Sequence, residues 1–224
     1  TARGTDLNVI ADDPFVAAGV AAAPSARPRL LAGRYLPTGT FYTSPTSEVA
    51  LAVDIKLGRR CVLKAVRDDL TLGDTDIPAS ALLLREAEVL RALAGPHTPA
   101  VHDCFTAPGR AYLVLEDIEG ETFERTIAMR RETGRPATSS EIAAWAAALA
   151  GALGWLHARG HAYLDLKPTN VIVAPDGRLR LIDFDAVTPL GEALTRSRGT
   201  RGYVSPERAA GGPFVVSVLE DIHA

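Results

Sequence analysis

The chain has 224 residues, a formal net charge of −3 at pH 7 and 47% hydrophobic residues. This length and composition predict one globular domain or two closely associated lobes. A slightly acidic chain lacks the basic footprint of nucleic-acid-binding proteins, so we expect no nucleic acid partner. Two isolated cysteines without a Cys-x-x-Cys motif fit reduced thiols in a cytoplasmic protein.

Residues 1–32 are rich in Ala and Pro and lack periodicity, so we expect a linker or an N-terminal arm there. Asp12 and Asp13 precede the apolar run at residues 15–26, where a signal peptide would carry basic residues. The other apolar run, at residues 142–156, is short for a bilayer span and predicts a buried helix. We therefore expect no membrane segment.

A β-rich part follows the arm. Strand patterns occupy residues 34–41, 48–54 and 60–66, with turns at residues 43–47 and at Gly58. Short strands that follow one another through tight turns are typical of an antiparallel meander.

A helix is predicted over residues 82–94, before the stop signal Gly95-Pro96. Glu86 falls on the apolar stripe of this helix, whereas Glu88 falls on its polar side. A carboxylate on the inward face of a helix needs a partner, so Glu86 is either functional or a boundary residue that reaches solvent.

Two further strands are predicted at residues 101–105 and 111–116, and the pattern then becomes helical. Thr138 and Glu141 form a capping box at the start of a long Ala/Leu-rich helix, which stops at Gly160.

A short hairpin follows, with strands at residues 171–173 and 179–182, and the chain from Asp185 onward reads as loop. A β-rich part with one helix, followed by a helical part with short hairpins, predicts an α+β fold with two lobes.

The densest polar group lies between the long helix and this hairpin. Asp165, Lys167 and Asn170 share one short loop, and Asp183 ends the next hairpin. Mg²⁺ prefers carboxylate and amide oxygens, which Asp183 and Asn170 supply. Asp165 could orient a hydroxyl and receive its proton, and Lys167 could neutralise a phosphate. A satisfied polar turn would explain any one of these residues alone, but the whole set favours phosphate chemistry.

This loop resembles the catalytic loop of eukaryotic-type (Hanks) Ser/Thr protein kinases, H-R-D-L-K-x-x-N, as found in bacteria. Further motifs of that family occur in the expected order. The matching segments are Cys61–Lys64, Arg85–Leu90, Asp165–Asn170, Asp183–Phe184, Gly199–Glu207 and the helix start Asp221–Ala224. The resemblance covers residues 34–224 and implies a two-lobed kinase fold with an antiparallel N-lobe sheet.

The resemblance implies ATP and Mg²⁺ as cofactors. By this likeness Asp165 would orient the acceptor hydroxyl and Lys167 would meet the γ-phosphate. Asn170 and Asp183 would hold Mg²⁺. The substrate would be a protein or peptide that contains Ser or Thr.

The resemblance also assigns a nucleotide site. Lys64 would hold the α- and β-phosphates and pair with Glu86. The residues implied to contact the adenine ring or its edge are Val49, Val62, Leu115, Glu116, Ile118 and Ile172. The Gly-rich phosphate loop matches poorly, because Ser44 and Ser47 stand at its glycine positions and Gly39 lies further upstream.

The catalytic motifs depart from the family at three positions. Tyr163 replaces a histidine, and Asp185 replaces the glycine of D-F-G. The sequence does not decide the role of Asp185. Leu164 replaces the arginine that receives an activation-loop phosphate, so we expect activity without phosphorylation of that loop. Loss of activity on mutating Thr195, Ser197 and Thr200, solely because phosphorylation is blocked, would contradict this expectation. The resemblance also implies that Thr200 fixes the catalytic loop to the activation segment.

We expect a kinase N-lobe at residues 33–118 and a partial C-lobe at residues 119–224, truncated at the start of its central helix, in a longer protein with flanking domains. Several segments are also similar to the kinase domains of class III and IV lanthipeptide synthetases, which would make the substrate a precursor peptide. Two alternatives stay open: a pseudokinase that acts as a binding scaffold, and a small-molecule phosphotransferase of the aminoglycoside-kinase type.

Overall fold

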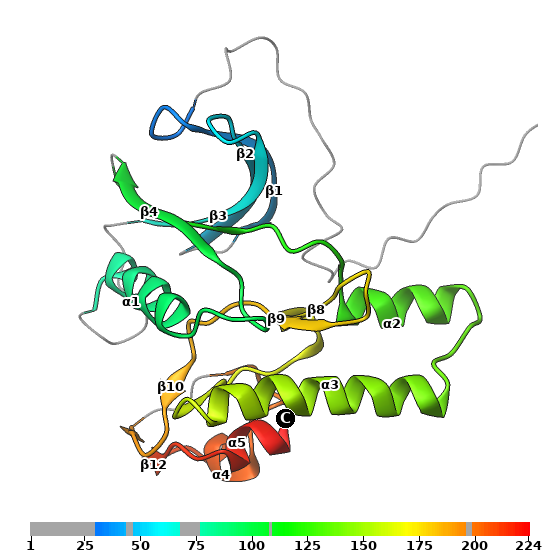
Figure 1. Cartoon of the computed structure of the whole chain (residues 1–224). Helices are drawn as coiled ribbons and strands as arrows, with labels where there is room; N and C mark the ends of the chain where they lie inside the picture. Colours follow the sequence, from blue (N-terminus) through cyan, green and yellow to red (C-terminus); the bar gives the residue numbers. More distant parts are fainter. Residues whose placement is uncertain (1–29, 44–46, 68–76, 108, 196–198) are drawn as a thin grey trace, which may run out of the picture. The chain divides into compact units, whose positions relative to one another are not determined.

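The computed structural model of the protein describes residues 30–43, 47–67, 77–107, 109–195 and 199–224. Contacts divide the chain into two compact units (Figure 1). Unit 1 contains the described residues up to Ser80 together with Asp103–Leu115, and unit 2 contains Ala81–His102 and Glu116–Ala224. The expected division into an N-lobe at residues 33–118 and a C-lobe at residues 119–224 stays a prediction.

Most of a five-stranded sheet with the order β1-β2-β3-β5-β4 lies in unit 1. The strands are β1 (Tyr35–Thr43), β2 (Ser47–Asp54), β3 (Arg59–Arg67), β4 (Val101–Ala107) and β5 (Arg110–Glu116). The pairs β1–β2 and β2–β3 are antiparallel, which confirms the predicted meander.

Alternation along the strands of unit 1 separates a core face from a second face. Ala52, Cys61 and Leu63 form a buried cluster with Tyr35 and Val114. Successive side chains of a strand point to opposite faces. The residues directly before and after these core residues in the strands therefore point to the other face of the sheet.

The helices are α1 (Ala79–Ala92), α2 (Phe123–Glu132), α3 (Ser139–His157), α4 (Pro206–Ala209) and α5 (Leu219–His223). The capping box of α3 is present as predicted, with Thr138 and Glu141 bonded to each other's backbone. Helix α2 is not predicted from the sequence, because it buries no residue and so has no apolar stripe to detect.

Unit 2 also holds very short strands. The sheets have the orders β6-β8-β9, β10-β7 and β11-β12. Their strands are β6 (Glu121–Thr122), β7 (His161–Ala162), β8 (Val171–Val173), β9 (Leu179–Leu181), β10 (Thr188–Pro189), β11 (Ala193–Leu194) and β12 (Phe214–Val215).

The expectation of plain loop from Asp185 onward is therefore wrong where β10 to β12, α4 and α5 lie. Two-residue strands and helices of one turn show no periodicity in sequence, and tertiary contacts decide them. The helix expected at Asp221–Ala224 is confirmed as α5, although it begins two residues earlier, at Leu219.

The expected α+β fold class is confirmed, with a sheet in the early part of the chain and helices with short hairpins in the later part. Within the part of the chain that the structure describes, no helix has the length and apolar character needed to cross a membrane.

Candidate active site

The predicted catalytic loop runs from β7 to the short 3₁₀ helix Pro168–Asn170. Leu164 adopts a left-handed backbone with φ of 67°, which a residue with a side chain keeps only when its surroundings hold it. Asp221 of α5 provides that hold: its Oδ2 accepts the N–H of Tyr163 and its Oδ1 accepts the N–H of Leu164, both at 2.7 Å. His157 Nε2 lies 2.8 Å from Asp221 Oδ2 and orients the carboxylate.

The carboxylate of Asp165 is the hub of the loop, and the residue is 7% exposed. Its Oδ1 accepts the backbone N–H of Thr200 at 2.7 Å and the Thr200 hydroxyl at 2.8 Å. Its Oδ2 accepts from Lys167 Nζ at 2.8 Å and from Asn170 Nδ2 at 3.0 Å. Lys167 also donates to Thr200 Oγ1 at 2.7 Å. Thr200 thus joins the catalytic loop to the Gly199–Glu207 segment, as expected.

Asn170 directly precedes β8 and Asp183 comes two residues after β9, so both lie at the open end of the β8–β9 hairpin. The N–H of Ile182, the residue before Asp183, donates to the carbonyl of Asn170 at 2.9 Å. Because Asn170 Nδ2 is bonded to Asp165, its Oδ1 is turned the other way and is the atom suited to a hard cation. Asp183 has a left-handed backbone with φ of 66°.

The amide oxygen of Asn170 and the carboxylate of Asp183 are ligand types that fit Mg²⁺. Among the described residues no group of three or more His, Cys, Asp or Glu side chains is arranged to hold a metal. Mg²⁺ commonly keeps several waters and takes one or two protein ligands together with substrate phosphates, so the pair matches its chemistry.

Tyr163 connects the catalytic loop to the D-F-D segment, which is Asp183–Asp185. Its hydroxyl donates to the carbonyl of Ile182, and its ring meets the Phe184 ring edge-on with centroids 5.5 Å apart. Burial raises the pKa of Tyr163 well above its ordinary value, which keeps the hydroxyl protonated as a donor. Tyr163 thus stands where the motif has a histidine, and its hydroxyl makes a specific hydrogen bond there.

Glu86 lies on the inward face of α1, as the helical spacing predicts, and is 2% exposed, whereas Glu88 is exposed. Its Oε1 accepts the backbone N–H of Phe184 at 3.2 Å. The boundary-residue interpretation of Glu86 is therefore wrong, because a side chain that reaches solvent would not be buried.

In unit 1 the strand register gathers the residues assigned to the nucleotide on the face away from the core cluster. Val49 of β2 is directly opposite Lys64 of β3, and Leu51 is opposite both Val62 of β3 and Gly39 of β1. Directly opposed residues of antiparallel strands carry their side chains on the same face. Leu115 is buried near the end of β5. Ser47 begins β2, and Ser44 lies outside the described residues.

Glu116, at the end of β5, is held by groups that no sequence motif assigns. Its carboxylate accepts from Arg180 Nη1 and Nη2 at 3.1 and 2.8 Å and from the N–H of Ala100 at 3.0 Å. Burial alone would raise the pKa of Glu116, but Arg180 and Ala100 outweigh it and lower the pKa. Arg180 also donates to the Thr98 carbonyl at 2.5 Å.

A backbone hydrogen bond decides which main-chain group Glu116 offers to a ligand. The N–H of Glu116 donates to the Ala100 carbonyl at 2.9 Å, so its own carbonyl, rather than its N–H, is suited to the adenine edge. Ile118 follows in an irregular segment. Ile172 lies in β8 opposite Thr122 and Arg180, and a Cβ added at Gly120 would lie 2.9 Å from Ile172 Cγ2.

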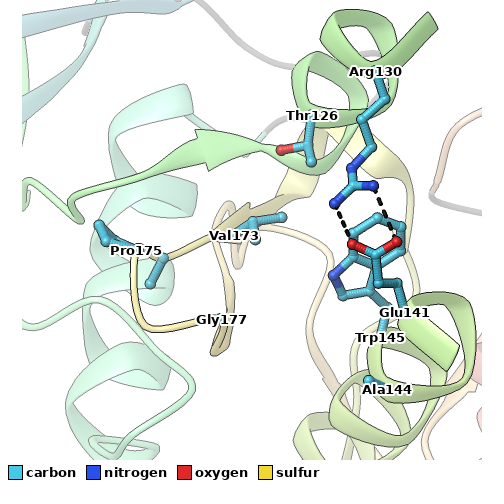
Figure 2. A pocket seen from close by; sticks show the side chains of 9 residues that line it. Thr126, Arg130, Glu141, Ala144, Trp145, Val173, Pro175 and Gly177 are labelled. Carbon is cyan, nitrogen blue, oxygen red and sulfur yellow. Dashed lines mark hydrogen bonds and ion pairs between the residues drawn. The ribbon is translucent and has the colours of Figure 1, made fainter. Parts of the chain in front are cut away.

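A separate hollow of about 350 Å³ lies among α2, α3 and the β8–β9 turn (Figure 2). It is lined by Thr126, Arg130, Glu141, Ala144, Trp145, Val173, Ala174, Pro175 and Gly177. Arg130 pairs with both oxygens of Glu141 and lies over the Trp145 ring, 5.1 Å from its centroid. None of the residues assigned to catalysis or to the nucleotide lines this hollow.

Comparison with known proteins supplies the family. The model of the protein kinase domain family matches residues 44–221. A probable serine/threonine-protein kinase of Streptomyces coelicolor is 29% identical over 82% of this chain. Serine/threonine-protein kinase PknL of Mycobacterium tuberculosis is 30% identical over 82% of it, and the rabbit protein kinase C zeta type is 30% identical over 73%. The chain spans 28%, 45% and 27% of the lengths of these three relatives.

Proposed function

The chain belongs to the protein kinase domain family, and we propose that the protein carrying it transfers the γ-phosphate of ATP to Ser or Thr of a protein or peptide. The observation that carries the proposal is the Asp165 carboxylate, which is held by Lys167, Asn170 and Thr200 at one point. Such transfers depend mainly on positioning and on neutralising phosphate charge, which a preorganised cluster of this kind supplies.

Asp165 would receive the hydrogen bond of the acceptor hydroxyl and, as the oxygen–phosphorus bond forms, its proton. The bond between the γ-phosphorus and the bridging oxygen breaks, and ADP leaves. Lys167 uses two of its three N–H donors on Asp165 and Thr200, and we assign the third to a γ-phosphate oxygen.

The residues proposed for the nucleotide are assigned within each unit. In unit 1, Lys64 would hold the α- and β-phosphates, with Val49 and Val62 against the adenine ring. In unit 2, Asn170 Oδ1 and the Asp183 carboxylate would hold Mg²⁺, which neutralises phosphate charge when bound. Glu86, proposed as the partner of Lys64, is buried and already fixes the D-F-D backbone through Phe184.

We assign Ser and Thr rather than Tyr as acceptors, because Lys167 follows Asp165 by two residues and the relatives carry names of serine/threonine kinases. The narrower prediction, a precursor peptide in lanthipeptide dehydration, stays a prediction, as do the cytoplasmic location and the flanking domains.

Two alternatives are weaker on specific observations. A pseudokinase scaffold has no need of the complete set of Lys64, Glu86, Asp165, Asn170 and Asp183, all of which are present. A small-molecule phosphotransferase of the aminoglycoside-kinase type lacks the Gly199–Glu207 segment, and here Thr200 of that segment is bonded to the catalytic carboxylate.

The test uses the whole protein that carries this chain, with Mg²⁺ and ATP labelled on its γ-phosphate. The acceptors are peptides encoded by neighbouring genes, generic Ser/Thr proteins and small alcohols. Wild type is compared with Asp165→Asn, and the expected result is label on Ser or Thr with wild type alone. Label only on small alcohols would support the aminoglycoside-kinase type, and equal label from both variants would remove Asp165 from the chemistry.

A further inference from the structure

A buried arginine follows the Gly199–Glu207 segment and has no role in the function proposed above. Arg208 lies in α4 and is 3% exposed. A guanidinium stays charged at neutral pH, so its burial requires compensating acceptors nearby. Burial lowers the pKa of Arg208, and the carboxylates of Glu220, Asp221 and Asp165 act in the opposite direction.

The contacts of Arg208 join three segments of unit 2. Its Nη1 and Nη2 donate to the carbonyl of Leu164 in the catalytic loop at 3.3 and 3.4 Å. Its Nε lies 3.7 Å from Glu220 Oε2 in α5, and Ser205 donates to the same carboxylate oxygen at 3.1 Å. Its guanidinium lies 5.3 Å from the centroid of the Phe214 ring in β12.

The carbonyl that Arg208 binds belongs to the peptide bond between Leu164 and Asp165. The N–H of Leu164 is bonded to Asp221, so this left-handed residue is held on both sides: by a carboxylate at its N–H and by a guanidinium at its carbonyl. Arg208 therefore binds the peptide group that leads directly into Asp165.

Gly199 shows how closely a third segment approaches the same point. A Cβ added there would lie 2.8 Å from the Leu164 carbonyl oxygen and 3.2 Å from Arg208 Nη2, and the φ of Gly199 is 116°. The next residue, Thr200, donates its N–H to Asp165. The two chain segments that meet at Arg208 thus both lead to the catalytic carboxylate.

We propose that Arg208 is a positioning residue for the transfer reaction. Its guanidinium fixes the Leu164–Asp165 peptide against the Gly199–Thr200 segment. The positive charge that does this is part of the Arg208 side chain. The consequence for catalysis rests on the proposed kinase function. The consequence for backbone order does not, because it follows from the contacts alone.

The test compares Arg208→Met and Arg208→Lys with wild type in the whole protein. Met removes the charge and the donors at similar length, whereas Lys keeps the charge but offers one ammonium in place of a planar fork. Arg178→Met is the matched control, because Arg178 lies in the β8–β9 turn with its side chain 71% exposed. The readouts are amide hydrogen exchange by peptide, thermal unfolding, and kcat and KM.

For Arg208→Met we expect exchange about tenfold faster in peptides that cover residues 163–165 and 199–201, with peptides of α2 unchanged. We expect kcat to be about 100-fold lower and the KM for ATP to change less than about threefold. The reason is that a misplaced Asp165 lowers the rate of the transfer step more than it weakens the binding of ATP. Arg208→Lys should give an intermediate kcat, and Arg178→Met should match wild type.

Unchanged exchange around Asp165 in Arg208→Met would overturn the proposal. So would a loss of kcat that merely follows the unfolded fraction, since that indicates a general structural role. If Arg208→Met does not fold, the same two readouts on Arg208→Lys decide. If wild type transfers no phosphate to any acceptor, the kinase function fails, and the exchange measurement still decides whether Arg208 holds the loop.

Discussion

At the scale of single residues, the hydroxyl of Thr200 links Asp165 to Lys167. This hydroxyl donates to Asp165 Oδ1 and accepts from Lys167 Nζ, so one oxygen fixes the spacing of the two groups proposed to act on the phosphate. A hydroxyl engaged in this way is structural. Independence from phosphorylation is therefore tested by replacing Thr195 and Ser197 rather than Thr200; Ser197 lies outside the described residues.

Replacing Thr200 should separate its hydroxyl from its backbone contribution. Thr200→Ala keeps the N–H bond to Asp165 but removes the shared hydroxyl, so we expect kcat to fall about 10- to 100-fold. Thr200→Ser keeps the hydroxyl and should stay within about threefold of wild type. Steady-state kinetics at saturating ATP checks this, and equal activity of the Ala and Ser variants would show that the hydroxyl does not position Asp165 and Lys167.

Residue types and spacing are enough to predict part of the site. Asp165, Lys167 and Asn170 share one loop, and the helical period alone places Glu86 inward. Arg180 and Arg208 could not be found in this way. Their partners Glu116 and Leu164 lie 64 and 44 residues away in sequence, so only the folded chain brings them together.

At the scale of elements, the turn that follows α1 packs closely against α3. Gly95 follows α1, which carries Glu86, and its N–H donates to Thr98 Oγ1 at 3.1 Å. A Cβ added at Gly95 would meet the Trp155 ring of α3, with Cη2 at 2.9 Å. The position thus needs glycine for close packing against an aromatic side chain.

Gly95→Ala should destabilise the protein by about 1–3 kcal/mol, because the added methyl group overpacks the contact with Trp155. Gly151→Ala is the matched control: Gly151 lies inside α3, and an added Cβ would meet nothing within 4 Å. That substitution should stabilise by roughly 0.5–1 kcal/mol through helix propensity. Urea unfolding compares the two, and equal effects would contradict the packing role of Gly95.

The junction of α2 and α3 should respond to acid. Hydrogen bonds from Arg130 and from Thr138 lower the pKa of Glu141 to about 2. Figure 2 shows the pair between Arg130 and Glu141. A carboxyl group with a depressed folded pKa adds stability that is present above its unfolded pKa of about 4.3 and is lost as the pH falls toward 2.

Glu141→Gln removes this titration, so the stability difference between wild type and Glu141→Gln should be largest above pH 4.3 and shrink below it. Urea unfolding of both proteins across this pH range measures the difference. A difference that does not change with pH would assign the role of Glu141 to hydrogen bonding alone.

At the scale of the whole molecule, each unit carries its own part of the proposed chemistry. Unit 1 presents Val49, Val62 and Lys64 on one face of its sheet, and unit 2 holds the acidic and amide groups around Asp165. Strand alternation and the α3 capping box made much of this architecture predictable from sequence. The short strands and helices after Asp185 were not predictable, because contacts rather than periodicity define them.

We propose that Asp165 directs phosphate transfer once the protein has bound its nucleotide. The most direct test is a single-turnover measurement of γ-phosphate transfer to Ser or Thr, together with the Kd for ATP, in wild type, Asp165→Asn and Arg178→Met. We predict equal Kd values throughout, wild-type transfer by Arg178→Met, and transfer about 10³-fold slower in Asp165→Asn. Equal transfer rates in all three proteins, or ATP binding by wild type with no transfer, would contradict the claim.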